Sequence, residues 1–167
     1  MSDIIKQLML HEGVRLKPYR CSAGKLTIGV GHNYQDNGLP EWLRSELGAK
    51  SNDCVELTRA INEHAFTMEQ SDRLLLDDVA KFRMALERRL PWFGELDAIR
   101  KRVLIDMAFN MGIATLMTFK NTLKMIEQGD YVGASKGMMS SKWAKQVKGR
   151  AERLSKMMAT GKDYDAV

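Results

Sequence analysis

The segment HEGVRLKPYRCSAGKLTIGVGH carries residues whose types and spacing suit catalysis. Eight residues separate Glu12 from Cys21, and five separate Cys21 from Thr27. Hydrolysis of a glycosidic bond usually requires two groups that flank the glycosidic oxygen, one of them a carboxylic acid that protonates the leaving group. The other group activates a water molecule or attacks the anomeric carbon. We therefore predict Glu12 as the acid, Cys21 as the second group and Thr27 as an accompanying hydroxyl.

The elements around this segment are predicted to bring the three residues together. An apolar-periodic helix is expected to end at Glu12, because a glycine follows it. Apolar and polar or small residues alternate over 26–30, which predicts a strand, and Ser22-Ala23-Gly24 is typical of a turn. Residues 19–30 are therefore predicted as a hairpin directly after the helix. Thr27 would face away from its apolar neighbours and so line a cleft.

The spacing Glu-x8-Cys-x5-Thr, followed by Ile-Gly-x-Gly-His, resembles the signature of the T-even-phage-type lysozymes, the endolysins of glycoside hydrolase family 24. That family has Asp or Cys at the middle position. Three further segments match the family in the right order. TMEQSDRLLLDDV resembles the start of its long inter-lobe helix, RKRVLIDMAFNMG its buried central helix, and SSKWAKQVKGRAER its C-terminal Ser-Lys/Arg-Trp-x6-Arg segment. The resemblance covers nearly the whole chain.

An α+β, lysozyme-like fold is implied by this resemblance. We expect one lysozyme domain over residues 1–167, with a small N-terminal lobe containing a β-hairpin or sheet over about 13–66. A connecting helix over about 67–90 would lead to a mostly helical C-terminal lobe over about 91–160, which helix 1–12 would join.

The sequence pattern supports several of these elements independently. Thr67 and Gln70 form a capping box that predicts the start of a helix. Residues 33–66 have a loose pattern, with a short helix expected near Trp42 and a loop over 48–53. Beyond Pro91 all elements are predicted as helices. One is expected to be central because it is apolar on most sides, and another to run from Leu116 to Ile126.

The middle position has chemical consequences because a thiol replaces the commoner Asp. An ordinary thiol has a pKa of about 8.5, so only a few per cent is thiolate at pH 7. Either the cations Arg20 and Lys25 lower the pKa of Cys21, or activity rises toward alkaline pH. The thiolate would activate water, giving inversion, or attack directly, giving retention. We favour the water route because Thr27 is well placed to hold the water.

The resemblance also implies further site residues. It places Arg150 next to Glu12, where the cation would position the acid. It pairs His32 with Asp78 as a structural ion pair. At position 137 this chain has glycine where the family more often has a polar side chain, which leaves only a backbone contact there. The substrate-binding residues implied are Asn33, Phe109, Asn110, Thr122, Gly137, Ser141, Lys142 and Arg150, with Trp143 beside them.

Composition limits the classes of protein to consider. The chain has 167 residues, of which 44% are hydrophobic and 28% charged, as is ordinary for a globular protein. The N-terminus lacks a basic region before an apolar run, so we expect no secretory signal. By resemblance, the protein would accumulate in the cytoplasm of the infected host until a separate membrane-permeabilising protein releases it to the periplasm and cell wall.

The cysteines and histidines indicate no cofactor. Two cysteines are too few for a disulfide framework and would stay reduced in the cytoplasm, although a regulatory Cys21–Cys54 disulfide is an alternative. The three histidines are scattered without zinc-ligand spacing, and no phosphate-binding glycine loop is present. We therefore expect neither a metal nor a nucleotide.

The net charge of +5 and the pI of about 9.2 favour association with polyanions. Residues 140–162 are rich in Lys and Arg, with Leu154, Met157 and Met158 between them. This segment is predicted as a solvated helical face. Alternatively, the basic C-terminal helix would press on an anionic outer-membrane or lipid surface.

The leading hypothesis is a monomeric endolysin, a muramidase that hydrolyses the β-1,4 bond between N-acetylmuramic acid and N-acetylglucosamine. Its partner would be the glycan strands of peptidoglycan, and its role would be host cell lysis at phage release. A non-catalytic wall- or membrane-binding protein and a cysteine hydrolase of the peptide cross-links are the alternatives. A nucleic-acid module fits the charge alone, so we expect no nucleic-acid partner.

Overall fold

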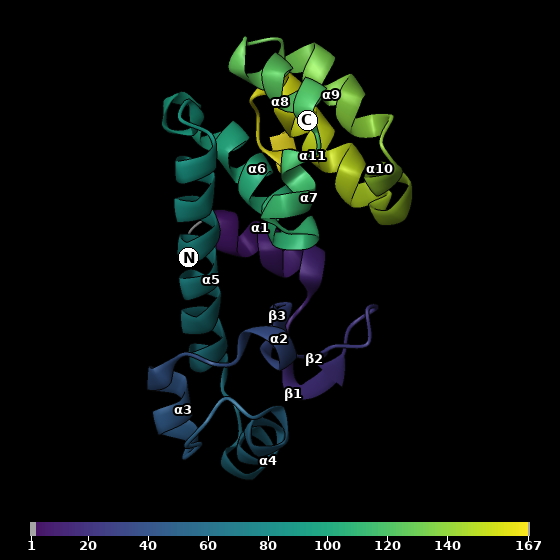
Figure 1. Ribbon diagram of the computed structural model, residues 1–167. Helices are drawn as coiled ribbons and strands as arrows, with labels where there is room; N and C mark the ends of the chain where they lie inside the picture. The colour runs from purple at the N-terminus through teal and green to yellow at the C-terminus, as the bar shows by residue number, and fades with distance from the viewer. Residues whose placement is uncertain (1–2, 167) are drawn as a thin grey trace. The chain divides into compact units, whose positions relative to one another are not determined.

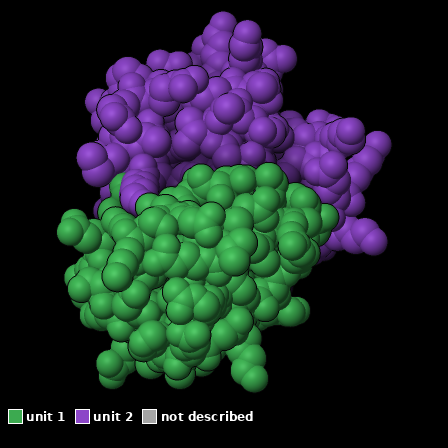
Figure 2. All heavy atoms as spheres, turned by 60° about the horizontal axis from the view of Figure 1, so that its bottom comes forward, with its two compact units in different colours: residues 1–80 green, residues 81–167 purple. Residues whose placement is uncertain are grey.

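The computed structural model describes residues 3–166, and the chain forms two compact units, residues 1–80 (unit 1) and 81–167 (unit 2), coloured separately in Figure 2. The boundary between the units falls within helix α5 (Met68–Arg89). The predicted helix over about 67–90 therefore corresponds to α5. The predicted assignment of residues 1–12 to the helical lobe stays a prediction.

Unit 1 combines a small antiparallel sheet with short helices, as the α+β prediction requires (Figure 1). The strand order is β1-β2-β3. Its elements, before the first part of α5, are α1 (Asp3–Glu12), β1 (Arg15–Arg20), β2 (Leu26–Gly29), β3 (His32–Asn33), α2 (Tyr34–Asn37), α3 (Glu41–Leu47) and α4 (Cys54–His64).

The register of the sheet aligns three polar side chains across one face. Tyr19 on β1 pairs with Thr27 on β2, and Thr27 pairs with Asn33 on β3. Since successive side chains of a strand point to opposite faces, Ile28 lies on the other face, where it joins the core of unit 1. The predicted hairpin is confirmed, with its turn at residues 21–25.

Helix α4 is an element that the sequence reasoning did not predict. Asp53 caps its N-terminus by accepting a hydrogen bond from the backbone N–H of Glu56 at 3.0 Å. Leu57, Ala60 and Ile61 are buried at helical spacing. The Asp-x-x-Glu start and this spacing were the signals available in the sequence. By contrast, the capping box of α5 is confirmed: Thr67 and Gln70 exchange hydrogen bonds of 3.0 and 3.1 Å.

Unit 2 is helical throughout the residues that the structure describes. Helices α8, α9 and α11 lie side by side in Figure 1 and contact one another. The elements after α5 are η1 (Phe93–Glu95), α6 (Ala98–Met111), α7 (Ile113–Met117), α8 (Lys120–Glu127), α9 (Tyr131–Met139), α10 (Lys142–Val147), α11 (Gly149–Thr160) and η2 (Tyr164–Ala166).

Helix α6 is the central helix that the sequence predicted, because all seven residues from 102 to 108 are buried. Two of these residues are charged, and each has an oppositely charged partner. Arg102 donates to both carboxylate oxygens of Asp163 at 2.7 and 2.9 Å. Asp106 accepts from Arg150. The ion pairs offset the cost of burying these charges.

The single helix predicted from Leu116 to Ile126 is wrong, since the segment forms α7 and α8. Thr118 Oγ1 donates to the carbonyl oxygen of Thr115 at 2.6 Å, and Phe119 has a ψ of 52°. The non-helical backbone of Phe119 starts a new helix axis at Lys120. Among residues 3–166, no helix combines the length and apolarity needed to cross a membrane.

Candidate active site

Glu12 occupies the last residue of α1, as predicted. Gly13 adopts a φ of 72°, and its backbone N–H donates to the carbonyl oxygen of Met9 at 2.9 Å. Glycine reaches this left-handed conformation without strain, so the chain leaves the helix directly after Glu12 and enters β1. The Glu12 side chain is half-buried rather than fully solvated.

Cys21 begins the turn between β1 and β2. The Cys21 N–H donates to the carbonyl oxygen of Lys25 at 3.0 Å, and the Gly24 N–H donates to that of Cys21 at 2.8 Å. These bonds close the turn around the sulfur. The backbones of Ala23 and Lys25 then form hydrogen bonds to the sulfur.

This turn lowers the pKa of the thiol. Burial raises the pKa of Cys21, but hydrogen bonds from the backbones of Lys25 and Ala23 and from the Thr27 side chain bring it below that of an ordinary cysteine. The predicted cations are not the cause. The Arg20 guanidinium donates to the carbonyl oxygen of Gly24 at 2.7 Å.

Lys25, the second predicted cation, is also engaged elsewhere, because its ammonium contacts Asp36 Oδ1 at 3.1 Å. Backbone donors and one hydroxyl, rather than cationic side chains, therefore stabilise the thiolate. Both Cys21 and Cys54 are free thiols in the structure.

Thr27 connects the sulfur to the sheet. Its side chain is buried, and its Oγ1 donates to the carbonyl oxygen of Lys25 at 2.9 Å. The same hydroxyl forms a hydrogen bond to Cys21. A hydroxyl has one proton, so donation to the thiolate competes with donation to the carbonyl oxygen. Thr27 thus acts first on the ionisation of Cys21.

Tyr19 is a site residue that the sequence reasoning missed. It lies opposite Thr27 in the sheet, and the Arg15 guanidinium stands 4.6 Å from its ring centroid. Burial raises the pKa of the Tyr19 phenol, and the charge of Glu12 raises it further, followed by a smaller effect of Cys21. The protonated phenol therefore lies within electrostatic range of both predicted catalytic groups. The strand alternation that placed Thr27 was the signal that also pointed to Tyr19.

Asn33 lies next to Thr27 in the sheet, but its amide is engaged. Asn33 Oδ1 accepts from the backbone N–H of Asp36, and its Nδ2 donates to Asp36 Oδ2, both at 3.0 Å. The side chain therefore caps α2. A contact between this amide and substrate would have to replace these bonds.

His32 and Asp78 are brought together, as the resemblance implied. His32 Nδ1 lies 2.7 Å from Asp78 Oδ2, and its Nε2 lies 2.8 Å from the carbonyl oxygen of Gly38. Both side chains are buried. The pair fastens β3 to α5 within unit 1.

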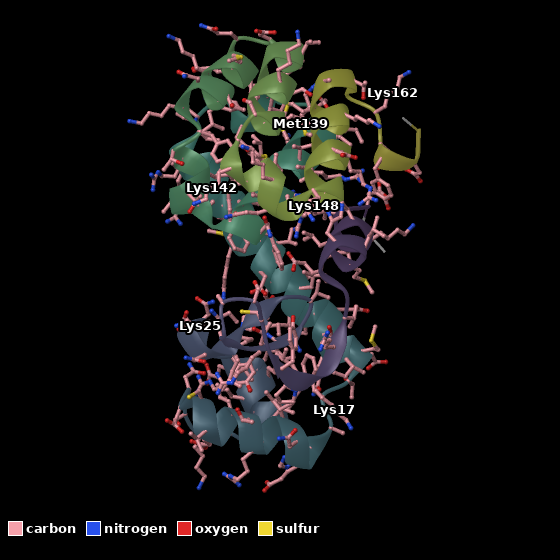
Figure 3. The ribbon with its side chains drawn as sticks, turned by 90° about the vertical axis from the view of Figure 1, so that its right-hand side faces the viewer. Lys17, Lys25, Met139, Lys142, Lys148 and Lys162 are labelled. Carbon is pink, nitrogen blue, oxygen red and sulfur yellow. The ribbon has the colours of Figure 1, made fainter. Side chains whose placement is uncertain are left out.

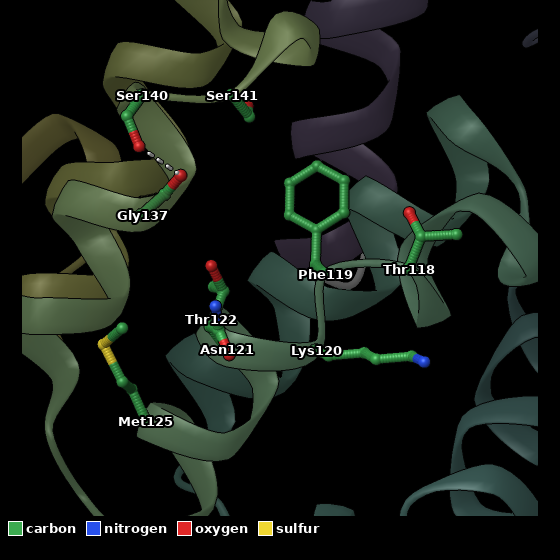
Figure 4. Close-up of a pocket in the computed structure, with 9 residues that line it drawn as sticks. All are labelled: Thr118, Phe119, Lys120, Asn121, Thr122, Met125, Gly137, Ser140 and Ser141. Carbon is green, nitrogen blue, oxygen red and sulfur yellow. Dashed lines mark hydrogen bonds between the residues drawn. The ribbon is translucent and has the colours of Figure 1, made fainter.

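Unit 2 contains a pocket of about 680 Å³ between α8 and α9 (Figure 4). It brings together three of the predicted substrate-binding residues, Thr122, Gly137 and Ser141. Phe109, Asn110, Lys142 and Arg150 do not line it. The lining residues are Thr118, Phe119, Lys120, Asn121, Thr122, Met125, Gly137, Ser140 and Ser141.

Gly137 keeps the Thr122 hydroxyl open. A Cβ atom at position 137 would lie 2.6 Å from Thr122 Oγ1, a distance that real Cβ atoms essentially never show. Thr122 is only 7% exposed, and within the described part of the chain its hydroxyl has no hydrogen-bond partner. The absence of a side chain at 137 therefore does more than remove a contact, since it leaves a polar group facing the pocket.

Asn110 and Trp143 form a hydrogen-bonded pair. The indole Nε1 donates to Asn110 Oδ1 at 2.7 Å, and because an indole N–H only donates, the amide nitrogen of Asn110 must face away. Phe109 packs on Phe82 with ring centroids 5.5 Å apart, and Trp143 packs edge-on against Phe119. Trp143 is buried, so it acts as a core residue that orients Asn110.

Arg150 is held by the fully buried Asp106. Its Nε and Nη2 lie 2.8 and 2.7 Å from the same carboxylate oxygen. Glu12 belongs to unit 1 and Arg150 to unit 2, so the predicted proximity of the two stays a prediction. Lys142 is exposed at the start of α10, directly after Ser141.

No group of three or more His, Cys, Asp or Glu side chains in residues 3–166 is arranged to hold a metal ion. The groups that hydrogen-bond to the Cys21 sulfur are all backbone or hydroxyl groups, and no histidine is among them in this part of the chain. Unit 1 therefore presents a carboxyl group, a phenol, a stabilised thiol and a hydroxyl. These groups are suited to proton transfer and to activation of water.

Comparisons with known proteins agree with this chemistry. Residues 9–158 match the sequence model of the phage lysozyme family. The chain is 31% identical to a probable T4-type lysozyme 1 from Dictyostelium discoideum, with 96% of both chains covered. It is 30% identical to an endolysin of Acyrthosiphon pisum secondary endosymbiont phage 1, over 81% of this chain and 73% of that one. It is also 29% identical to the pre-baseplate central spike protein Gp5 of Enterobacteria phage T4, over 95% of this chain but 28% of that protein.

Proposed function

Because this chain belongs to the phage lysozyme family, we propose that it hydrolyses the β-1,4 bond between N-acetylmuramic acid and N-acetylglucosamine in peptidoglycan. The family and the endolysin relative support a lysozyme activity of the glycoside hydrolase type. The observation that carries the finer proposal is the turn around Cys21, which stabilises a thiolate beside Thr27 in the same unit as Glu12.

The reaction proceeds in one displacement. The protonated Glu12 carboxyl donates its proton to the glycosidic oxygen as the bond from that oxygen to the anomeric carbon breaks. The Cys21 thiolate accepts a proton from water, and the water oxygen bonds to the anomeric carbon from the opposite face, which inverts its configuration. Proton exchange with solvent then restores the acid and the thiolate. Tyr19, held protonated between the two groups, donates a hydrogen bond to substrate or water.

The release of reducing ends from purified peptidoglycan tests this proposal. Wild type is expected to release them, and Glu12→Gln to lower the rate by about 100-fold or more, as loss of a general acid does. Cys21→Ala is expected to be similarly impaired, whereas Cys54→Ala, the matched control, keeps activity. An inactive wild type, or an active Glu12→Gln, would refute the proposal.

A cysteine hydrolase acting on peptide cross-links is the second candidate, and the structure gives it less support. Such a nucleophile needs a nearby general base, usually histidine. Among the described residues His32 is engaged with Asp78, and His64 contacts a carbonyl oxygen of its own helix. Cleavage products would distinguish the two reactions, because amide hydrolysis releases amines rather than reducing sugars.

We also propose that the protein lyses the host at phage release and waits in the host cytoplasm for a separate membrane-permeabilising protein. The endolysin relative supports this role. Fractionation of cells that express the protein alone is expected to leave it with cytoplasmic markers. Lysis without any permeabilising partner would contradict the proposal.

A further inference from the structure

The two units differ in charge. Residues 81–167 contain 17 Lys and Arg but 9 Asp and Glu, a net charge of +8, whereas residues 1–80 contain 9 and 12, a net charge of −3. Within residues 131–162 there are eight cations and one acid, Glu152. The positive charge of the chain is thus concentrated on the last three α-helices.

A stripe of α9 and α10 presents this charge to solvent. Val132, Lys136 and Met139 follow one another at helical spacing on α9, and all three are exposed. Lys142 and Lys145 on α10 and Lys148 after it continue the stripe, which we call the lysine surface. Figure 3 shows Met139, Lys142 and Lys148 on the same side of unit 2.

The ammonium groups of the lysine surface are uncompensated. Within the described residues, none of its four lysines forms an ion pair. Four unpaired cations on one surface repel one another, so their clustering lowers the stability of the folded unit. An anionic partner would remove this cost.

Lys148 also has an unfavourable backbone conformation. Its φ of 47° and ψ of −110° belong to a region that glycine adopts freely and side-chain-bearing residues do not. The next residue is glycine, yet the strained position carries a lysine. A strained residue in the middle of an unpaired cationic cluster points to use of its ammonium group.

The exposed apolar side chains indicate which anion is bound. Val132 is 57% and Met139 is 41% exposed, and both lie beside Lys136. Interleaved basic and apolar side chains are typical of contact with the headgroup region of a membrane. A nucleic acid would leave Val132 and Met139 without a role. The nearby aromatic rings are also engaged, because Trp143 is buried and Arg100 lies 3.6 Å from the Tyr131 ring centroid.

The predicted route to lipid through the C-terminal helix does not fit the folded unit. Leu154, Met157 and Met158 of α11 are fully buried in unit 2. They are therefore unavailable to a membrane unless the unit unfolds. The lysine surface needs no such unfolding.

We propose that the lysine surface binds the phosphate headgroups of an anionic lipid bilayer, with Met139 and Val132 entering the interface. This binding is separate from hydrolysis and does not depend on the proposed catalytic groups. It gives the protein a second site, which recognises a surface rather than a glycan.

Flotation of the full chain with vesicles tests the proposal. We expect binding to vesicles of phosphatidylglycerol and phosphatidylcholine, loss of that binding at high salt, and little binding to phosphatidylcholine alone. Lys145→Gln with Lys148→Gln should weaken partitioning by about 30-fold, from about 1 kcal/mol for each lysine near an anionic surface. Lys50→Gln with Lys81→Gln removes the same charge elsewhere and should change it by less than about threefold.

Two further variants separate the proposal from simple attraction to any phosphate polymer and from misfolding. Met139→Ser should weaken vesicle binding by about fivefold but leave binding to duplex DNA unchanged. Lys148→Gly relieves the backbone strain, so it should melt no lower than wild type while binding vesicles more weakly. Equal binding to neutral vesicles, an equal effect of the control pair, or DNA binding tighter than vesicle binding and insensitive to Met139 would each overturn the proposal.

Discussion

Replacing Thr27 by valine removes one hydroxyl and preserves the shape of the side chain. In the structure this hydroxyl serves the Cys21 sulfur and the carbonyl oxygen of Lys25. Its loss takes a donor from the thiolate, so the pKa of Cys21 should rise and less thiolate should be present at a given pH. Activity that requires the thiolate then moves to higher pH.

The magnitude follows from the hydrogen bond that is lost. A hydrogen bond to a charged group contributes about 1.5–3 kcal/mol, and sharing the proton with the Lys25 carbonyl oxygen reduces this to about 1.4 kcal/mol. That free energy corresponds to an activity about tenfold lower than wild type wherever the thiol is mostly protonated. Stability should fall by about 1 kcal/mol, a decrease in Tm of about 2–4 °C, so assays at 25 °C remain valid.

The assay is kcat/KM for release of reducing ends as a function of pH. Wild type and Thr27→Val should converge at high pH, where both thiols are ionised. The water-holding role predicted for Thr27 has a different signature, an equal loss at every pH. If the rising limb of Thr27→Val coincides with that of wild type, Thr27 does not stabilise the thiolate and the reasoning fails.

Two controls sharpen this result. In a Cys21→Asp background the carboxylate is ionised throughout the range, so Thr27→Val should no longer move the limb. Thr58 donates to the carbonyl oxygen of Cys54 at 2.7 Å, a comparable bond beside the other cysteine. Thr58→Val should therefore leave the pH profile unchanged.

Three further changes test other parts of the structure. Thr122→Val removes a hydroxyl without a protein partner, so KM should rise about two- to tenfold while thermal melts stay within about 2 °C of wild type; a larger loss of Tm would indicate a structural role. Asp106→Ala leaves the Arg150 guanidinium buried without its acid, which should cost about 3–5 kcal/mol and lower Tm by about 6–20 °C; a drop below about 3 °C would contradict this. A hydrogen bond from Arg102 lowers the pKa of Asp163, so its stabilisation is present above the unfolded pKa and lost as pH falls through the folded pKa. Asp163→Asn should therefore melt below wild type at pH 7, and the difference should shrink below about pH 4; a constant difference would refute the pairing.

The catalytic segment was predictable because its residues are close in sequence. A helix end, a turn and one strand alternation suffice to place Glu12, Cys21 and Thr27 in one region. The cause of the lowered Cys21 pKa was not predictable, because it depends on where backbone N–H groups point within the turn. Tyr19 was missed because an aromatic residue in a strand suggests a core position, and only the register reveals its neighbours.

Unit 2 depended more on packing and was less predictable. Thr122 and Gly137 come from different helices, so their close approach cannot be inferred from spacing along the chain. The break at Phe119 was hidden because the apolar positions on both sides continue the same helical period. The buried residues of α6 form an uninterrupted run, and for this reason its central position was clear from the sequence alone.

The two ion pairs of α6 constrain how this sequence can change over evolution. Arg102 and Asp106 lie four residues apart on one buried helix, yet each depends on a partner more than forty residues away, Asp163 or Arg150. A substitution at one position of a pair would strand the opposite charge, so it should be accepted only together with a change at the other. In an alignment of homologues the four positions should covary as two independent pairs, and neutral residues should enter both positions of a pair together.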